Sequence, residues 1–221
     1  MQRILCLLLS IPFLLPADPP YRSRAGQPGQ FDYYVLSLSW SPQFCAGPQG
    51  QKGNNDIQCA PGKQFAFVAH GLWPQFLPRD WPESCSTAPG PNRQLVDRML
   101  DIMPAPGLIR HEWEKHGTCD GGTPAQYFDK VRAAYNAVKI PSIYRRPLKS
   151  IMVRPADLKR DFLQANPGAQ ENSIAVLCGG NGGRFLSEVR VCLSKDLHTR
   201  ACSQDVTDSC RVNQVIMPPV R

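Results

Sequence analysis

Nine cysteines are spread along this chain of 221 residues, and their number and placement constrain its fold more than any other feature. The first, Cys6, lies in an apolar run behind Arg3 that has the length of the central region of a signal peptide and is too short to span a bilayer. Removing this segment leaves eight cysteines. An even number in an exported chain indicates four disulfides rather than a cysteine nucleophile. Eight cysteines allow about 105 pairings, so their number alone does not identify the partners.

The N-terminal part of the chain differs in composition from the rest. We expect residues 1–25 to be a signal peptide and a disordered lead-in, cleaved after Ala17 or Ala25, because residues 18–30 are rich in Pro, Gly and Arg. The remaining residues, 26–221, have the length of a single domain. With 42% hydrophobic and 19% charged residues, the chain has the composition of a globular protein.

Strand patterns occur near both ends of this domain. Residues 31–40 carry apolar side chains at every second position, and residues 65–70 are expected to form a second strand that ends at His70. Residues 173–178 and 184–193 are expected to form a hairpin. The apolar positions of its second strand, which we expect on one face, are Phe185, Val189, Val191 and Leu193.

The glycine cluster at 179–183 joins these two strands. It lacks the Lys-Ser/Thr pair of a phosphate-binding P-loop, and no helical pattern follows it. The cluster therefore indicates a turn.

Three segments are expected to be helices: two have apolar residues at helical spacing behind a residue typical of a helix start, and a shorter third one precedes the Pro-Gly break at 167–168. They run from Asn92 to Met103, from Thr123 to the residue before Pro141, and from Pro155 to Ala165. We therefore expect an α+β fold, in which a central antiparallel sheet is joined by several helices and stapled by four disulfides.

The segment HEWEKHGTC, from His111 to Cys119, concentrates chemistry in nine residues. If residues 108–117 are helical, Glu112, Lys115 and His116 share with His111 an arc of about 140°. A carboxyl group, an imidazole and a cation on one arc suit phosphoryl chemistry, which needs a proton acceptor and fixed positive charge. The same pattern also fits a solvated helix face with charge pairs three or four residues apart.

Two histidines with glutamates between them also raise the alternative of a zinc hydrolase. That class places its histidines at i and i+4, so that both share a helix face, whereas His111 and His116 are five residues apart. We therefore expect no metal site.

The second chemical segment is VAHGLWPQ, residues 68–75. A single histidine after a strand is usually structural. Trp73, however, which we expect in a loop beside His70, offers a flat face on which a nucleic-acid base can stack. The excess of 25 Lys and Arg over 18 Asp and Glu gives a net charge of +7, which suits a polyanionic ligand but is also found in proteins that bind none.

Taken together, HGLWPQ (70–75), HEWEKHGTC (111–119) and FDYYVLSLSWSPQFC (31–45) closely resemble the ribonuclease T2 family. The resemblance covers nearly the whole chain after the apolar segment. It implies a metal-independent endoribonuclease that cleaves single-stranded RNA through a 2′,3′-cyclic phosphate, without any cofactor. DNA, which lacks the 2′-hydroxyl group, is not expected to be cut.

The resemblance also implies a role for each residue of the two segments. His116 is expected to act as general base and His70 as general acid, while Glu112 and Lys115 stabilise the transition state. His111 is expected to hold phosphate. Trp73 and Gln75 are expected to contact a base, with broad rather than strict base specificity.

Two further consequences follow from the resemblance. The disulfide pairs that it implies are Cys45–Cys59, Cys85–Cys119, Cys178–Cys210 and Cys192–Cys202. Two positions depart from the family pattern: Ala69 replaces a larger aliphatic residue, and Leu108 replaces an aromatic residue of the downstream base site. Base selection is therefore not determined by the sequence.

We expect a secreted or periplasmic monomer with no membrane attachment after processing. The chain has no Asn-x-Ser/Thr site for glycosylation, which favours a bacterial protein. A non-catalytic RNA-binding relative is the remaining alternative, although every catalytic position of the family is filled.

Overall fold

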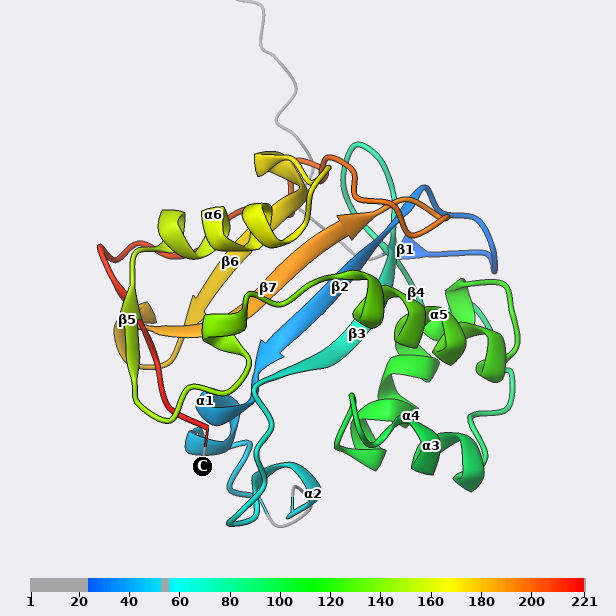
Figure 1. Cartoon of the computed structure of the whole chain (residues 1–221). Helices are drawn as coiled ribbons and strands as arrows, with labels where there is room; N and C mark the ends of the chain where they lie inside the picture. The colour runs from blue at the N-terminus through cyan, green and yellow to red at the C-terminus, as the bar shows by residue number, and fades with distance from the viewer. Residues whose placement is uncertain (1–23, 53–55, 221) are drawn as a thin grey trace, which may run out of the picture.

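A six-stranded sheet runs through the protein, with helices over one face and along one edge (Figure 1). The structure, a computed structural model, describes residues 24–52 and 56–220. Of the expected signal peptide and lead-in, residues 1–23 lie outside this range. In the part of the chain that the structure describes, no helix is long and apolar enough to cross a membrane.

The strands are β1 (Arg24–Ala25), β2 (Tyr33–Trp40), β3 (Phe67–Gln75), β4 (Pro82–Glu83), β5 (Ile151–Val153), β6 (Ile174–Gly179), β7 (Phe185–Leu193) and β8 (Val215–Met217). The α-helices are α1 (Ser41–Ala46), α2 (Asp56–Cys59), α3 (Arg93–Met99), α4 (Pro106–Lys115), α5 (Pro124–Ala137) and α6 (Pro155–Ala165). The expected α+β fold is confirmed. β5 and β8 were not predicted, because three residues are too few to show a period.

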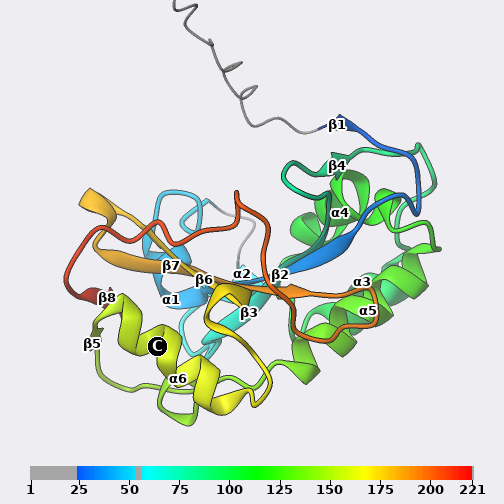
Figure 2. The same cartoon turned by 90° about the horizontal axis from the view of Figure 1, so that it is seen from above.

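The main sheet has the strand order β3–β2–β7–β8–β5, and β6 also pairs with β7. All neighbours are antiparallel except β7 and β8, which meet in parallel at Phe185 and Ile216. Figure 2 shows α5 and α6 on the same side of this sheet, with α4 and β4 toward the other side. The sheet therefore has one face for the core and one available for a site.

Alternation along β2 separates these two faces. Its predicted apolar positions all join the main core, where they meet side chains of α5 and α6; they are Tyr34, Leu36, Leu38 and Trp40. On the other face, Tyr33 and Val35 belong to a smaller cluster, and Ser37 and Ser39 follow them along the strand.

Strand β3 was expected to end at His70, but it continues to Gln75. Its register against β2 shifts by one residue: Ser37 pairs with Gly71, and Leu38 pairs with Ala69, which leaves His70 without a partner. This β-bulge interrupts the alternation of the strand. Pro74 is compatible with a strand here because β3 lies at the edge of the sheet.

The predicted hairpin of β6 and β7 is confirmed, but a second bulge changes its face pattern. Leu177 pairs with Glu188 and Cys178 pairs with Leu186, so one residue of β7 has no partner. As a result Leu186 is buried in the core with the following valines, whereas Phe185 is partly exposed. The expectation that Phe185 shares their face was therefore wrong.

The predicted helices are present with changed ends. α3 begins after Asn92, whose side chain accepts a hydrogen bond from the amide of Leu95, but it ends at Met99 rather than Met103. α6 has the expected bounds. α5 begins behind Thr123, as expected, and ends at Ala137.

All four disulfide pairings are confirmed: Cys45–Cys59, Cys85–Cys119, Cys178–Cys210 and Cys192–Cys202. The described part of the expected lead-in is not disordered. Residues 24–25 pair with β4, and the amide of Gly29 donates a hydrogen bond to the carbonyl of Cys119.

Removing the N-terminal cap of α5 should destabilise the protein without changing its fold. Thr123 and Gln126 form a capping box, in which each side chain bonds the other residue's amide. Thr123→Ala should lower the free energy of unfolding by about 1 kcal/mol, measured by urea denaturation. Thr123→Ser, which retains the hydroxyl group, is the matched control and should stay close to wild type.

Candidate active site

The face of the sheet opposite the main core carries a cavity of about 350 Å³ beside α4. Its lining includes every catalytic and substrate-binding residue predicted from the sequence: His70, Trp73, Gln75, His111, Glu112, Lys115 and His116. β3 contributes the first three residues, and α4 with the residue after it contributes the other four. Two segments about forty positions apart therefore meet at one site.

Helix α4 presents its polar arc to the cavity because its apolar side chains are held elsewhere. Ile109 and Trp113 are buried in the main core, which turns His111, Glu112 and Lys115 toward the cavity. Glu112 is only 2% exposed, and His116, which caps the C-terminus of the helix, is 6% exposed. The arc predicted for this segment is therefore present, and its central groups are buried.

His70 is held by two carboxylates on opposite sides of its ring. Its Nδ1 lies 2.7 Å from Oε1 of Glu188 on β7, and its Nε2 lies 3.7 Å from Oε1 of Glu112. The other oxygen of Glu188 accepts hydrogen bonds from Nε and Nη2 of Arg190, at 3.1 and 3.0 Å.

Trp73 was expected in a loop but lies on strand β3, and its indole is close to the rings of both histidines. The ring centroid is 5.2 Å from that of His70 and 5.4 Å from that of His116. Its Nε1 donates a 2.7 Å hydrogen bond to Oε2 of Glu112. The Arg190 guanidinium lies 4.9 Å from the ring centroid. The indole therefore neighbours both imidazoles, Glu112 and Arg190.

The two histidines have pKa values displaced in opposite directions. Burial lowers the pKa of His116 to about 3, and the positive charges of Lys115 and His70 add to this effect. Burial also acts to lower the pKa of His70, but the hydrogen bond and charge of Glu188 outweigh it and raise the pKa above its ordinary value. Near pH 6, His116 is therefore neutral and His70 carries a proton on both ring nitrogens.

Glu112 is also displaced from its ordinary state. Burial raises its pKa to about 7, although the charge of His70 and the hydrogen bond from Trp73 act to lower it. This carboxyl group therefore exchanges its proton near neutral pH, within reach of His70.

Residues 31–202 match the model of the Ribonuclease T2 family. The chain belongs to this family. A ribonuclease of Aeromonas hydrophila is 32% identical over 77% of this chain and 75% of its own length. Ribonuclease I of Escherichia coli is 26% identical over 78% of this chain and 79% of its own length.

Solved structures show the same T2-family fold at lower identity. An RNase-related protein from Calystegia sepium superposes with a TM-score of 0.68, at 21% identity, over 86% of this chain and 98% of that chain. A mutant of RNase MC1 in complex with 5′-UMP superposes with a TM-score of 0.63, at 19% identity, over 84% of this chain and 97% of that chain.

Three polar or aromatic residues of the T2-family site were missed in the sequence. Trp81 lines the same cavity, and Glu188 and Arg190 reach it from β7. The signal for the last two was present: polar side chains at alternate positions of an otherwise apolar strand indicate a second, polar face. Their contact with His70 depends on the order of the strands, which the sequence does not give.

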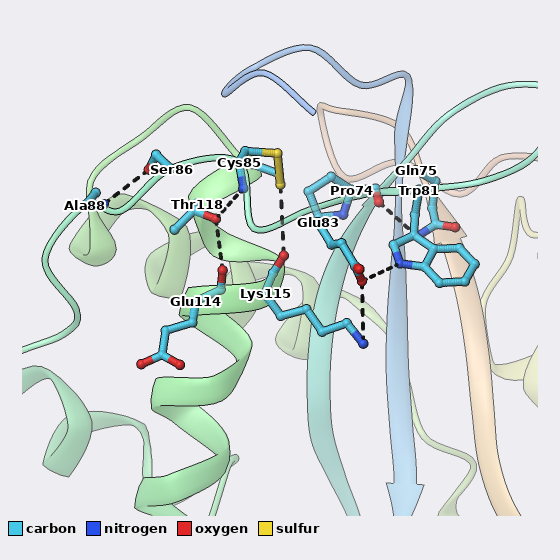
Figure 3. Close-up of a disulfide and its surroundings, with 11 residues drawn as sticks. Pro74, Gln75, Trp81, Glu83, Cys85, Ser86, Ala88, Glu114, Lys115 and Thr118 are labelled. Carbon is cyan, nitrogen blue, oxygen red and sulfur yellow. Dashed lines mark hydrogen bonds and ion pairs between the residues drawn. A yellow bond between two sulfur atoms is a disulfide. The ribbon is translucent and has the colours of Figure 1, made fainter. Parts of the chain in front are cut away.

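The Cys85–Cys119 disulfide of this T2-family chain joins the segment after β3 to the short turn, residues 117–119, that follows α4 (Figure 3). Beside it, Oε2 of Glu83 accepts a 3.4 Å hydrogen bond from the indole of Trp81 and lies 3.7 Å from Nζ of Lys115. The disulfide therefore holds the segment that carries Trp81 and Glu83 against α4.

A second cavity, of about 390 Å³, adjoins the other side of His70. It is more apolar, and its lining includes Phe44, Val68 and Leu108 but not His116. Leu108, which the family resemblance associates with a downstream base site, lines this cavity. Within the described residues, no three His, Cys, Asp or Glu side chains are grouped to hold a metal ion.

Adding a methyl group at Gly71 should disable the T2-family site while the fold persists. A Cβ atom there would lie 2.0 Å from Oε2 of Glu112 and 2.4 Å from Nε1 of Trp73. Gly71→Ala should therefore displace both groups and lower the kcat/KM for RNA cleavage by about 10²-fold. Gly90→Ala, where the nearest atom is a carbon of Trp113 at 3.8 Å, is the control and should cleave RNA at the wild-type rate.

Replacing Glu112 by Gln should stabilise the protein at alkaline pH. Because the pKa of the buried carboxyl group is raised from 4.5 to about 7, folding favours its protonated form. The contribution is fully present below pH 4.5 and is lost as the pH rises through 7, so the variant should gain up to about 3 kcal/mol on wild type by pH 8. Urea denaturation at pH 4 and pH 8 measures this change, with Glu114→Gln on the same helix as control. A gain that is equal at both pH values would contradict it.

Proposed function

We propose that this T2-type ribonuclease is an endoribonuclease that cleaves single-stranded RNA by transphosphorylation, without a metal ion. The observation that carries the proposal is the pair of histidines that line one cavity beside Trp73, one neutral and one protonated near pH 6. Acid–base cleavage of RNA needs one group to accept a proton and another to donate one at the same phosphate. These two imidazoles meet that requirement in a single cavity.

In the first step, neutral His116 accepts the proton of the ribose 2′-hydroxyl group while the oxygen attacks the adjacent phosphorus. Nδ1 of His116 is buried, so Nε2 is the nitrogen that meets substrate. His70 donates its Nε2 proton to the 5′-oxygen, whose bond to phosphorus breaks. The products are a 2′,3′-cyclic phosphate and a free 5′-hydroxyl group.

A pKa of about 3 makes His116 a weak base in the free protein. The negative charge of a bound phosphodiester favours the imidazolium form and so raises this pKa. Substrate binding therefore strengthens the base that acts on it.

The remaining groups of the cavity stabilise the charge that develops on the phosphoryl oxygens. Lys115 supplies a fixed cation at the end of α4, and His111, exposed on the same helix, contacts a phosphate oxygen. Glu112 in its protonated form donates a hydrogen bond to a phosphoryl oxygen, as its raised pKa allows.

We propose that the two cavities hold the two nucleotides on either side of the cleaved bond. The cavity shared by both histidines, with Trp73, Gln75 and Trp81, takes the upstream base. The apolar cavity, which touches His70 but not His116, takes the leaving nucleotide, because the general acid protonates its 5′-oxygen. Few polar groups line that second cavity, so the downstream base is weakly discriminated.

RNA as the substrate is supported by family membership and by the complex of RNase MC1 with a nucleotide, 5′-UMP. DNA has no 2′-hydroxyl nucleophile and is not cleaved by this route. Four disulfides favour an oxidising compartment. We therefore propose a secreted or periplasmic monomer that is not attached to a membrane.

Digestion of a defined oligoribonucleotide, with mass analysis of the products, tests the reaction. Cyclic phosphates should form in the presence of a chelator, and the matching oligodeoxyribonucleotide should stay intact. His70→Ala and His116→Ala should each lower the rate by about 10²–10⁴-fold with an unchanged circular dichroism spectrum.

Other outcomes decide between the alternatives. RNA binding without cleavage between pH 4 and 8 would identify a non-catalytic relative. Activity that disappears with chelator and returns with zinc would favour a zinc hydrolase. A variant of either histidine that cleaves at the wild-type rate would contradict its assigned role.

A further inference from the structure

The described residues contain one buried carboxylate in contact with a catalytic histidine that the proposed mechanism does not use. Glu188 is 9% exposed and lies on β7, two strands away from His70 in the sheet. Its register partner on β2 is Ser39, and Ser39 pairs with Val68 on β3. The bulge after Val68 brings His70 onto the same face as Glu188 and within hydrogen-bonding distance of it.

Both oxygens of Glu188 have partners. Oε1 accepts from Ser39 Oγ at 3.3 Å and lies 2.7 Å from Nδ1 of His70, while Oε2 accepts two hydrogen bonds from Arg190. A buried carboxylate in such a network is fixed in position and stays ionised. The hydrogen bonds and charges of His70 and Arg190 lower the pKa of Glu188 despite its burial.

An ionised carboxylate only accepts hydrogen bonds, so Nδ1 of His70 must be the nitrogen that carries hydrogen when the ring is neutral. Nε2 is then the nitrogen that gains and loses a proton, and it lies on the side of Glu112. We propose that Glu188 is a positioning residue for the general acid: it fixes the tautomer and orientation of His70, and Arg190 holds Glu188 in place.

This inference rests on the proposed function, and it adds a second task for the same contact. After the first step, His70 has lost its Nε2 proton and keeps the hydrogen on Nδ1. The free Nε2 lone pair then faces the cyclic phosphate and can accept a proton from the water that opens it. The Glu188 contact therefore prepares His70 for both steps.

Arg190 links this arrangement to the rest of the cavity. Its guanidinium holds Glu188 and also lies over the indole of Trp73, which neighbours both histidines. The charged groups that surround His70 are thus Glu188 and Arg190 from β7, with Glu112, Lys115 and His116 from the α4 segment. Only Glu188 contacts Nδ1 within hydrogen-bonding distance.

The test compares Glu188→Gln with wild type on two substrates that differ only in the leaving group. One is a uridine dinucleotide, whose 5′-oxygen must be protonated to leave. The other is a nitrophenyl ester of uridine 3′-phosphate, whose leaving group departs without a proton. The variant should lose about 10-fold or more in kcat on the dinucleotide and retain wild-type kcat on the ester, with little change in KM on either.

The pH profile gives a second readout. The neutral amide of Glu188→Gln does not stabilise the imidazolium ion of His70, so the alkaline limb of kcat/KM should move to lower pH. Nitrogen NMR of His70 should show the fixed Nδ1–H tautomer in wild type and a mixture in the variant. Glu171→Gln, the same change at an exposed position before β6, is the matched control and should match wild type in all three measurements.

Each outcome bears on one claim. If wild type does not cleave the dinucleotide, the proposed function fails. If wild type cleaves it and Glu188→Gln either matches wild type or loses equally on both substrates, the positioning role is wrong. Glu188→Asp, which keeps the charge but shortens the side chain, should show the same substrate-dependent loss and replaces Glu188→Gln if that variant does not fold.

Discussion

One unpaired residue in the ladder between β2 and β3 determines how the active site is built. Without the bulge, strict alternation from Gly71 would place residue 70 in the core and Ala69 on the site face. The extra residue reverses both positions, so Ala69 is buried in the main core and His70 meets Glu188. A small side chain at position 69 suits this arrangement, because the methyl group is fully buried. The departure from the family pattern at Ala69 thus lies on the core side of the bulge.

His70 on a strand and His116 at the end of a helix have the same side chain, but their surroundings displace their pKa values in opposite directions. His116 is enclosed at the end of α4 beside cations, and its pKa falls. His70 reaches a carboxylate on β7, and its pKa rises. The difference depends on neighbours that come from a third segment of the chain. The opposite pKa shifts of the two histidines therefore depend on strand β7 as well as on the two histidine-containing segments.

The sequence predicted those parts of the structure that depend on local patterns. The capped starts of α3 and α5, the alternation of β2 and the polar arc of α4 are properties of short segments, and each was confirmed. Predicting the disulfide pairs required the family resemblance, because an even number of cysteines leaves many pairings open. What local patterns cannot give are bulges and strand order. The bulges explain why Phe185 was assigned to the wrong face of its strand and why β3 was expected to end at His70. The unknown strand order explains why Glu188 was not predicted as a partner of His70.

The close packing around Gly71 also has a genetic consequence. The hydrogen bond between Trp73 and Glu112 passes through the space that a Cβ atom at position 71 would fill. Every single-base change of a glycine codon that yields another amino acid introduces a Cβ atom. No one-step amino-acid change at this codon therefore preserves the arrangement of Trp73 and Glu112, so position 71 is closed to the gradual substitution that exposed positions allow.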